Sequence, residues 1–294
     1  MKILLSGSTG FFGQIILKYL QNHDVFTINR FAGEYKVDLS KKVPEFSSCF
    51  DLVIHNAGKA HSFPRTETEE NSFFQVNTLG TKNLLQGLET LIPKQFVFIS
   101  SVSVYGLEYG VNVEDHAPLN AKDSYGLSKK QAEQIVIDWC NKNNVVCTIL
   151  RLPLIVAKNP PGNLGVMLKG IEKGYYFNIG GGKAKRSMVL AQDVAKFIPR
   201  IAQIGGVYNL TDGYHPSFKE LSHALANKPV FSLPLAIAKL FGKIGDLFGD
   251  TVPLNTRKIL KMTSDLTFDD SKAIKIGWKP QSVLEYIKHN DLVN

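Results

Sequence analysis

Tyr125 and Lys129 are the residues whose types and spacing most suggest chemistry. They stand four positions apart in the segment 124–143, whose pattern predicts a long helix, so their side chains share one helix face. An ammonium beside a phenol lowers the pKa of the phenol, and a phenol that titrates near working pH is a competent general acid or base. Ser101 and Ser103, at a predicted strand end, add hydroxyls that would hydrogen-bond a reacting oxygen. Together these side chains predict proton transfer at an oxygen atom.

A glycine-rich run near the start of the chain predicts a dinucleotide site. The run follows a predicted strand over 2–6 and opens a predicted helix over 10–20. In such a turn the first glycine allows the tight bend, the second admits a pyrophosphate and the third lets the helix pack closely on the strand. The helix N-terminus then faces the phosphates. We expect cofactor contacts from Gly7, Thr9, Gly10, Phe11, Phe12 and Gly13.

The end of the second predicted strand, over 25–29, bears on the choice between NAD and NADP. An acidic residue there would bind the ribose diol, but the chain has Asn29 and Arg30, and no carboxylate before Glu34. A guanidinium at Arg30 suits a 2′-phosphate, although a solvated surface arginine is an equally good interpretation of this one residue. We therefore favour NADP over NAD. Asp38 and Leu39 are placed where a loop would cover the adenine.

Short apolar strands alternate with helices through the first half of the chain, which predicts a doubly wound α/β fold of the Rossmann type with a parallel sheet. We expect a dinucleotide-binding domain over 1–155 with 186–210, interleaved with a smaller, mostly helical substrate lobe over 156–185 with 211–294. The predicted elements are strands at 2–6, 25–29, 52–55, 96–100, 145–152, 188–190 and 207–210, and helices at 10–20, 72–91 and 124–143.

Composition limits the classes of function. The 294 residues are 44% hydrophobic, enough for a large core, and Lys+Arg exceed Asp+Glu by 34 − 26 = 8. This excess suits a phosphate-bearing ligand, whereas nucleic acid is disfavoured because no binding motif accompanies the charge. The three cysteines lack the spacing of a zinc site or disulfide framework, and the histidines lack metal spacing, so we expect no metal. No segment is long and apolar enough to span a bilayer, and we expect a cytoplasmic protein.

One apolar segment in the second half has two interpretations. Over 234–248, Ile237, Leu240, Phe241 and Ile244 form a stripe beside two lysines, a pattern typical of a helix lying in a membrane interface. A lobe helix that packs this stripe over the substrate site is the favoured alternative.

Several stretches together resemble extended short-chain dehydrogenase/reductases, the group that contains nucleotide-sugar epimerases, dehydratases and reductases. The matching stretches are 6–13, 55–58, 77–85, 98–106 and 125–129. The resemblance implies that Ser101, Tyr125 and Lys129 are catalytic, that Lys129 also holds the nicotinamide ribose, and that Ser103 neighbours the substrate. Further implied contacts are Asn56, Ala57, Gly58 and Asn77 to the cofactor, and Asn163 and Arg186 to the substrate diphosphate.

The resemblance also bears on the reaction. Dehydratases of this group carry an Asp-Glu pair after the catalytic hydroxyl residue, but here Val102 and Ser103 follow Ser101, which disfavours dehydration. The histidine pattern from His55 to His61 is similar to that of 4-keto-6-deoxy nucleotide-sugar reductases. We therefore expect NADPH-dependent reduction of a UDP-4-keto-6-deoxy-hexose or hexosamine. A UDP-hexose 4-epimerase with tightly held NAD and a non-enzymatic NADP-sensing regulator remain as alternatives, and a homodimer through the helices at 72–91 and 124–143 is possible.

Overall fold

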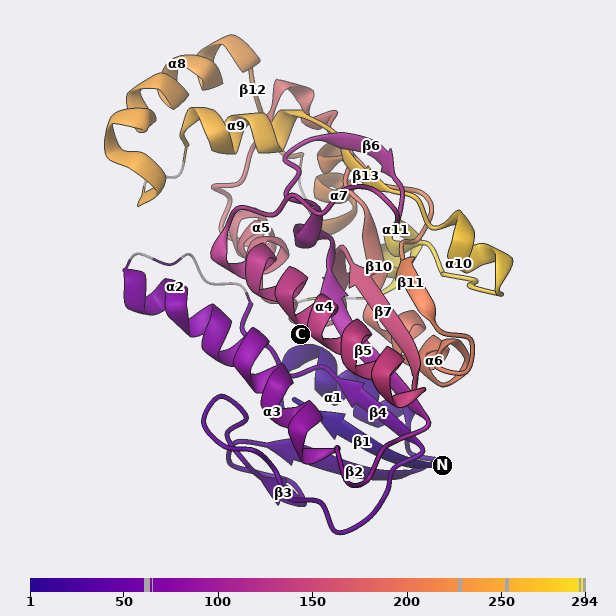
Figure 1. Cartoon of the computed structure of the whole chain (residues 1–294). Coiled ribbons are helices and arrows are strands. Elements are labelled where there is room, and N and C mark those ends of the chain that lie inside the picture. Colours follow the sequence, from indigo (N-terminus) through magenta and orange to yellow (C-terminus); the bar gives the residue numbers. More distant parts are fainter. Residues whose placement is uncertain (61–63, 65, 227–228, 252–253, 291, 293–294) are drawn as a thin grey trace.

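The structure is a computed structural model that describes residues 1–60, 64, 66–226, 229–251, 254–290 and 292 (Figure 1). His61, the second histidine of the pattern discussed above, lies outside these residues. Within the described part of the chain, no helix has both the length and the apolarity needed to cross a membrane.

A seven-stranded parallel sheet forms the centre of the first lobe, in the order β11-β7-β5-β4-β1-β2-β3. Read from β3, this is the doubly wound order, in which the chain starts in the middle of the sheet and winds outward in both directions. The Rossmann-type prediction is therefore confirmed. The strands are β1 (Lys2–Ser6), β2 (Asp24–Asn29), β3 (Tyr35–Lys36), β4 (Leu52–His55), β5 (Gln95–Ser101), β7 (Val146–Leu152) and β11 (Gly206–Asn209).

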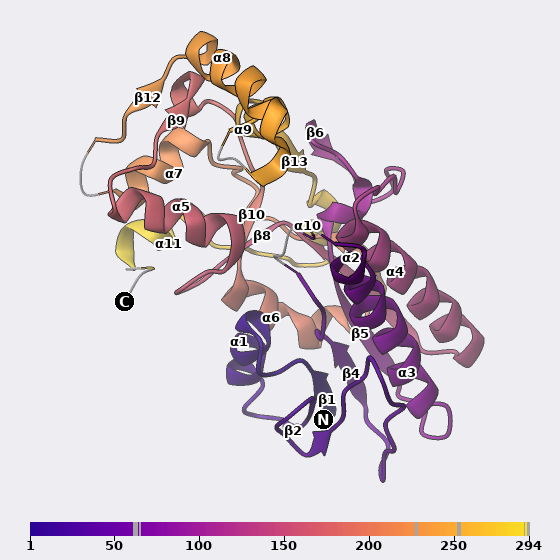
Figure 2. The same ribbon diagram turned by 90° about the vertical axis from the view of Figure 1, so that its left-hand side faces the viewer.

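Helices cover both faces of this sheet, as Figure 2 shows. On one face α1 (Phe11–Tyr19) and α6 (Ala191–Ile201) share a buried cluster with β1, β4, β5 and β7. On the other, α3 (Gly80–Gly87) and α4 (Ser124–Asn143) pack side chains such as Leu84 and Val136 on the sheet. Burial on both faces explains why the central strands are continuous apolar runs.

The helix predicted over 72–91 differs most from its prediction. It begins earlier, at α2 (Glu67–Phe73), passes through the π-helical segment η1 (Phe74–Leu79) and ends with α3. Thr66 caps its start by accepting a hydrogen bond from the backbone N–H of Glu69. Single π turns within helices are common at functional sites, and this one contains Asn77.

The second lobe is mostly helical, as predicted. Its core gathers α5 (Gly162–Glu172), α7 (Phe218–Leu225) and α11 (Val283–His289) around the short parallel pair β8 (Leu154–Val156) and β10 (Met188–Leu190). The other elements are β9 (Asn178–Ile179), the 3-10 turn η3 (Gly180–Gly182), β12 (Ser232–Leu233), α8 (Leu235–Gly245), the 3-10 turn η4 (Asp246–Thr251) and α9 (Thr256–Thr263). The interleaved boundaries given above stay a prediction.

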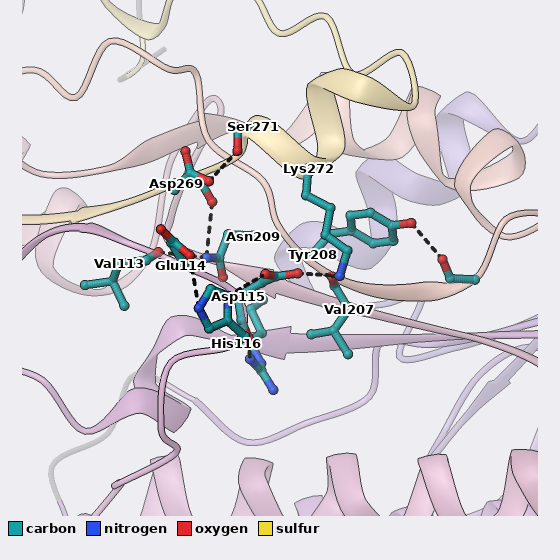
Figure 3. Close-up of polar contacts among 12 residues, drawn as sticks. Val113, Glu114, Asp115, His116, Val207, Tyr208, Asn209, Asp269, Ser271 and Lys272 are labelled. Carbon is teal, nitrogen blue, oxygen red and sulfur yellow. Dashed lines mark hydrogen bonds and ion pairs between the residues drawn. The ribbon is translucent and has the colours of Figure 1, made fainter.

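The closing segment of the chain returns to the first lobe and is fixed there by polar contacts (Figure 3). The segment contains β13 (Leu266–Phe268), which pairs with β6 (Gly110–Val113), and α10 (Ser271–Lys275). The ammonium of Lys272 contacts the carboxylate of Asp115 at 2.5 Å and the carbonyl of Val207 at 2.8 Å. The amide of Asn209 donates to the carbonyls of Val113 and Asp269. These bonds join Asp269 and Lys272 to strand β11 of the large sheet, and the chain then continues to α11 in the second lobe.

Candidate active site

The glycine-rich loop between β1 and α1 is shaped for a close approach of backbone atoms. Gly7 has φ +70° and its N–H donates to the carbonyl of Ile28. A Cβ on Gly13 would lie 2.0 Å from the carbonyl oxygen of Gly7, and one on Gly7 would lie 2.7 Å from the backbone of Ala57. Only glycine fits at either place, so α1 lies against the strand end with the N–H groups of its first turn directed into the loop.

Asn29, at the end of β2, holds this loop from the side. Its amide nitrogen donates to the hydroxyl of Ser8 at 2.9 Å, and its amide oxygen accepts weaker contacts from the backbone and hydroxyl of Thr9 at 3.4 and 3.5 Å. Asn29 is buried, and its side-chain amide is occupied by these bonds to Ser8 and Thr9 of the loop.

The nearest carboxylate after β2 also points back into the protein. Glu34 accepts hydrogen bonds from the backbone N–H and hydroxyl of Thr27 at 2.7 and 2.8 Å, and these bonds, led by the one from the backbone, lower the pKa of Glu34. Arg30 is exposed, with its guanidinium 5.7 Å from the ring centroid of Phe31. The first groups after β2 are therefore an amide turned inward and a guanidinium turned outward.

Asp38 and Leu39 lie on the loop that follows β3. The carboxylate of Asp38 accepts bonds from the hydroxyl and N–H of Ser40, which lower its pKa. Leu39 is buried in the cluster between the sheet and α3, and its carbonyl accepts a bond from the amide of Asn83. The adenine contacts expected of this pair stay a prediction.

Ser101 and Tyr125 meet at the carboxyl edge of the sheet. Ser101 ends β5, and its hydroxyl accepts from the N–H of Ser103 and donates to its hydroxyl at 3.1 Å. Tyr125 stands in the first turn of α4, whose N-terminus Asp123 caps through the N–H of Gly126. A Cβ on Gly126 would lie 2.6 Å from the carbonyl of Ser103. This glycine therefore brings the start of α4 against the turn over 101–103, called here the serine turn. Burial raises the pKa of Tyr125, and a hydrogen bond with Ser101 opposes the rise.

The ammonium of Lys129 is not among the groups that lower the pKa of Tyr125. Its ammonium donates to the carbonyl of Ile99 at 2.6 Å and lies 3.9 Å from the ring centroid of Phe98. Burial lowers the pKa of Lys129 to about 7, against the opposing charge of Glu133. The pKa of Tyr125 is raised rather than lowered, and the side chains that act on it are Ser101 and Asp123. The expected lowering of the phenol pKa is therefore wrong for this arrangement, because the ammonium points into the sheet.

A buried network of polar side chains runs from the end of β1 to the π-helical segment. The hydroxyl of Ser6 accepts from the N–H groups of Asn56 and Ala57 at 3.1 and 3.0 Å and lies 2.7 Å from Nδ1 of His55. Nε2 of His55 lies 2.9 Å from the hydroxyl of Thr81. Complete burial lowers the pKa of His55 to about 3, so the ring is neutral.

The hydrogen-bonded network continues to the helix that carries Tyr125 through Asn77. Thr81 donates to the carbonyl of Asn77 at 2.6 Å, which leaves the threonine oxygen to accept from Nε2–H of His55. The amide of Asn77 donates to the hydroxyl of Ser128 at 2.9 Å, and Ser128 donates to the carbonyl of Tyr125 at 2.8 Å. Asn77 also bonds the backbone of Lys59 through both its donor and its acceptor. The glycine loop and the Tyr125 helix are thus joined by hydrogen bonds of buried side chains and of the backbone carbonyl of Asn77.

The residues expected to bind the substrate diphosphate lie in the second lobe. Asn163 is exposed in the first turn of α5. The guanidinium of Arg186 donates to the carbonyls of Lys185, Ser264 and Lys261, so it caps the C-terminal end of α9. In the structure Arg186 orders its own lobe, and contact of either residue with a diphosphate stays a prediction.

Sequence reasoning missed Glu133 and Arg151, which form a buried ion pair beside Lys129. Glu133 is buried one helical turn beyond Lys129 and forms a bidentate ion pair with Arg151 at 2.8 to 3.2 Å. Ser100 donates to the same carboxylate. The i, i+4, i+8 spacing of Tyr125, Lys129 and Glu133 was the available signal, since it places all three on one helix face.

Comparison with known proteins assigns the family. Residues 3–210 match the model of the NAD dependent epimerase/dehydratase family, and the chain belongs to it. A UDP-glucose 4-epimerase of Vibrio cholerae is 30% identical, over 96% of this chain and 92% of that protein. A GDP-6-deoxy-D-mannose reductase of Pseudomonas aeruginosa is 25% identical, over 77% of this chain and 79% of its own length. The fold matches that of a Thermus thermophilus UDP-glucose 4-epimerase in complex with NAD, with a TM-score of 0.74, 20% identity and coverage of 98% and 97%.

Alanine at two glycines of the loop is expected to have different effects. Gly13→Ala places a Cβ 2.0 Å from the Gly7 carbonyl and should lower the melting temperature, whereas the Cβ of Gly10→Ala meets the same oxygen at an ordinary 3.5 Å. Gly10→Ala should therefore melt close to the wild type but bind NADPH more weakly, since the added methyl stands where the pyrophosphate approaches. Thermal melts and NADPH titrations measure the two effects, and equal melting temperatures would contradict the crowding at Gly13.

The neutral state of His55 predicts a pH dependence of stability. The unfolded chain takes up a proton near the ordinary value of 6.5, but the folded protein does so only near 3. As pH falls from about 6.5 toward 3, the unfolded state binds more protons and the free energy of unfolding decreases. His55→Gln should flatten this dependence in urea unfolding between pH 7 and pH 4, while the exposed control His116→Gln should not. If an NMR titration shows that His55 becomes protonated near pH 6 in the folded wild type, the neutral state assigned to this ring is wrong.

Proposed function

We propose that the protein is an NADPH-dependent oxidoreductase that reduces the 4-keto group of a UDP-linked 6-deoxyhexose or hexosamine. The observation that carries the proposal is the meeting of Ser101, at the end of β5, and Tyr125, in the first turn of α4, at the carboxyl edge of the sheet. Ligands bind at this edge in this architecture. The nucleotide-sugar class is supported by the relatives, one named for a UDP-sugar epimerase and one for a GDP-sugar reductase.

The loop fits a dinucleotide, because the absent side chain of Gly13 lets the N-terminus of α1 lie against the loop, and within 4 Å a Cβ on Gly10 would meet only the carbonyl oxygen of Gly7, at 3.5 Å. Gly7 to Gly13 would hold the pyrophosphate, and Asn56, Ala57, Gly58 and Asn77 would contact the nicotinamide half. The chemistry that NADPH supplies when bound is a hydride for the sugar carbonyl carbon.

Tyr125 is the proton donor in this proposal. Burial raises the pKa of its phenol, so the group carries its proton at neutral pH, as an acid for a developing alkoxide requires. Ser101 donates a second hydrogen bond to the same oxygen and so stabilises the charge that develops there. In this proposal Lys129 holds the nicotinamide ribose once its ammonium turns away from the carbonyl of Ile99. Its pKa of about 7 means that this ammonium loses its charge as the pH rises through neutrality.

NADP is favoured by the groups after β2. Asn29 has an amide, which is bonded to Ser8, and the carboxylate of Glu34 is bonded to Thr27, so neither residue offers a free carboxylate to a ribose diol. Arg30 is exposed at the place where a 2′-phosphate would lie.

Epimerisation at C4 is the second candidate, favoured by the similarity to the Vibrio cholerae epimerase along most of the chain. The two reactions differ in their cofactor balance, since a reductase consumes NADPH at each turnover and an epimerase returns its hydride. NADPH oxidation with a 4-keto sugar nucleotide supports the reductase; interconversion of UDP-hexoses without added cofactor supports the epimerase. Binding of NADP without turnover of either substrate would support the regulator.

Tyr125→Phe tests the proton donor. NADPH oxidation with a UDP-4-keto-6-deoxyhexose should fall by about 10²-fold or more, because the general acid is removed. NADPH affinity should stay within about twofold, and the exposed control Tyr175→Phe should retain full turnover. A variant that loses NADPH binding together with turnover would count against this role.

Arg30→Ala tests the cofactor preference. Loss of a charge-assisted bond to a 2′-phosphate should weaken NADPH binding by about tenfold and leave NADH binding unchanged. Fluorescence titrations with both cofactors measure the ratio, with the exposed Lys36→Ala as control. Equal effects on NADPH and NADH would exclude the phosphate contact.

A further inference from the structure

Helix α8 presents its large apolar side chains to solvent. The packed lobe helix favoured by the sequence is wrong here, because the buried residues of α8 are the small ones, Ala238, Gly242 and Gly245. The exposed fractions are 62% for Leu240, 52% for Phe241 and 50% for Ile244, with 44% for Ile237 and 82% for the following Leu247. A helix of a globular protein normally buries its large apolar residues, whereas α8 buries its small residues and exposes the large apolar ones.

Close packing against α9 fixes the rotation of α8. A Cβ on Gly242 would lie 2.4 Å from Cδ1 of Ile259, so a larger side chain cannot face α9 at this point. The carboxylate of Asp246, directly after α8, accepts from the N–H and hydroxyl of Thr256 at 2.8 and 2.6 Å. Since these contacts hold the small residues against α9, the large apolar residues must point outward.

The charges on α8 suit an anionic partner. Its only charged residues are Lys239 and Lys243, both exposed, and at 100° per residue they lie along one edge of the apolar stripe. An apolar stripe edged by lysines is the pattern with which a helix lies in the headgroup region of a bilayer. A second copy of this chain on the same face would bring two lysine pairs together around a two-fold axis, which the net charge of +8 also opposes.

We propose that α8 binds the surface of a membrane containing anionic phospholipid, with its apolar side chains in the headgroup region. Figures 1 and 2 both place α8 at the end of the molecule away from β2, where a flat surface can reach it. Arg186 ties the C-terminal end of the neighbouring α9 to the second lobe. Membrane binding at α8 would therefore hold the second lobe near the bilayer without using Ser101, Tyr125 or Lys129.

Vesicle flotation tests the proposal on the full chain. Wild type should float with vesicles of phosphatidylcholine and about 30% phosphatidylglycerol, and less with phosphatidylcholine alone. Phe241→Asp and Leu240→Asp should each reduce the bound fraction at least about fivefold, because a carboxylate enters the apolar face. Ile274→Asp is the matched control, since Ile274 is a helical residue 53% exposed in α10, and it should float like the wild type.

The lysines have a separate test. Lys239→Glu with Lys243→Glu should lower binding to the anionic vesicles and leave the weak binding to neutral vesicles unchanged, and salt should mimic this effect in the wild type. Each variant should melt like the wild type, because the substituted side chains are exposed.

Three outcomes would overturn the proposal. The proposal is excluded if the wild type floats with neither the anionic nor the neutral vesicles. It is also excluded if the Phe241→Asp variant floats as well as the wild type. A wild type that is dimeric in light scattering, becomes monomeric on Phe241→Asp and binds no vesicles would instead make this face an interface between copies. NADPH oxidation is measured separately on soluble substrate, so failure of the reductase proposal and failure of membrane binding are distinguishable.

Discussion

The buried polar network from Ser6 to Ser128 is the interaction on which the site depends. Ser6 holds the strand end beside the glycine loop, and Ser128 holds the backbone of the Tyr125 helix. His55 can link them only as a neutral ring, because its two nitrogens must donate to one hydroxyl and accept from another. Burial keeps it neutral by lowering its pKa to about 3. A buried network of this kind is stabilising only while every member is paired, so it holds the end of β1 and the Tyr125 helix in one geometry.

Glycines supply the second constraint, at three separate contacts. Gly13 brings α1 to the loop, Gly126 brings the start of α4 to the serine turn, and Gly242 brings α8 to α9. In each case the absent Cβ decides which face of a helix meets its neighbour. The first two contacts position the glycine loop and Tyr125. The third turns the apolar side of α8 outward, and the same physical device therefore underlies both the proposed catalytic site and the proposed membrane surface.

Electrostatics separates the two titratable residues of the site. Tyr125 keeps its proton because burial disfavours the phenolate, while Lys129 is driven toward neutrality by the same low dielectric. The Glu133–Arg151 pair lies behind Lys129, and its carboxylate limits that fall. A protonated phenol beside a serine hydroxyl is suited to delivering a proton, which is the direction that the proposed reduction requires.

The sequence by itself determined the fold class and most strands, because apolar runs of strand length separated by helices leave little choice but a parallel sheet. It also located Gly7 to Gly13, Ser101 and Tyr125, since their spacing is set by local turn and helix geometry. The tertiary structure alone decided the direction of Lys129, the pairing of Arg186 with the end of α9, the π-helical turn at Asn77 and the outward face of α8. These features depend on contacts with atoms of segments that are distant in the sequence. Helical periodicity gives the width of an apolar face, but it does not show whether that face is buried or exposed.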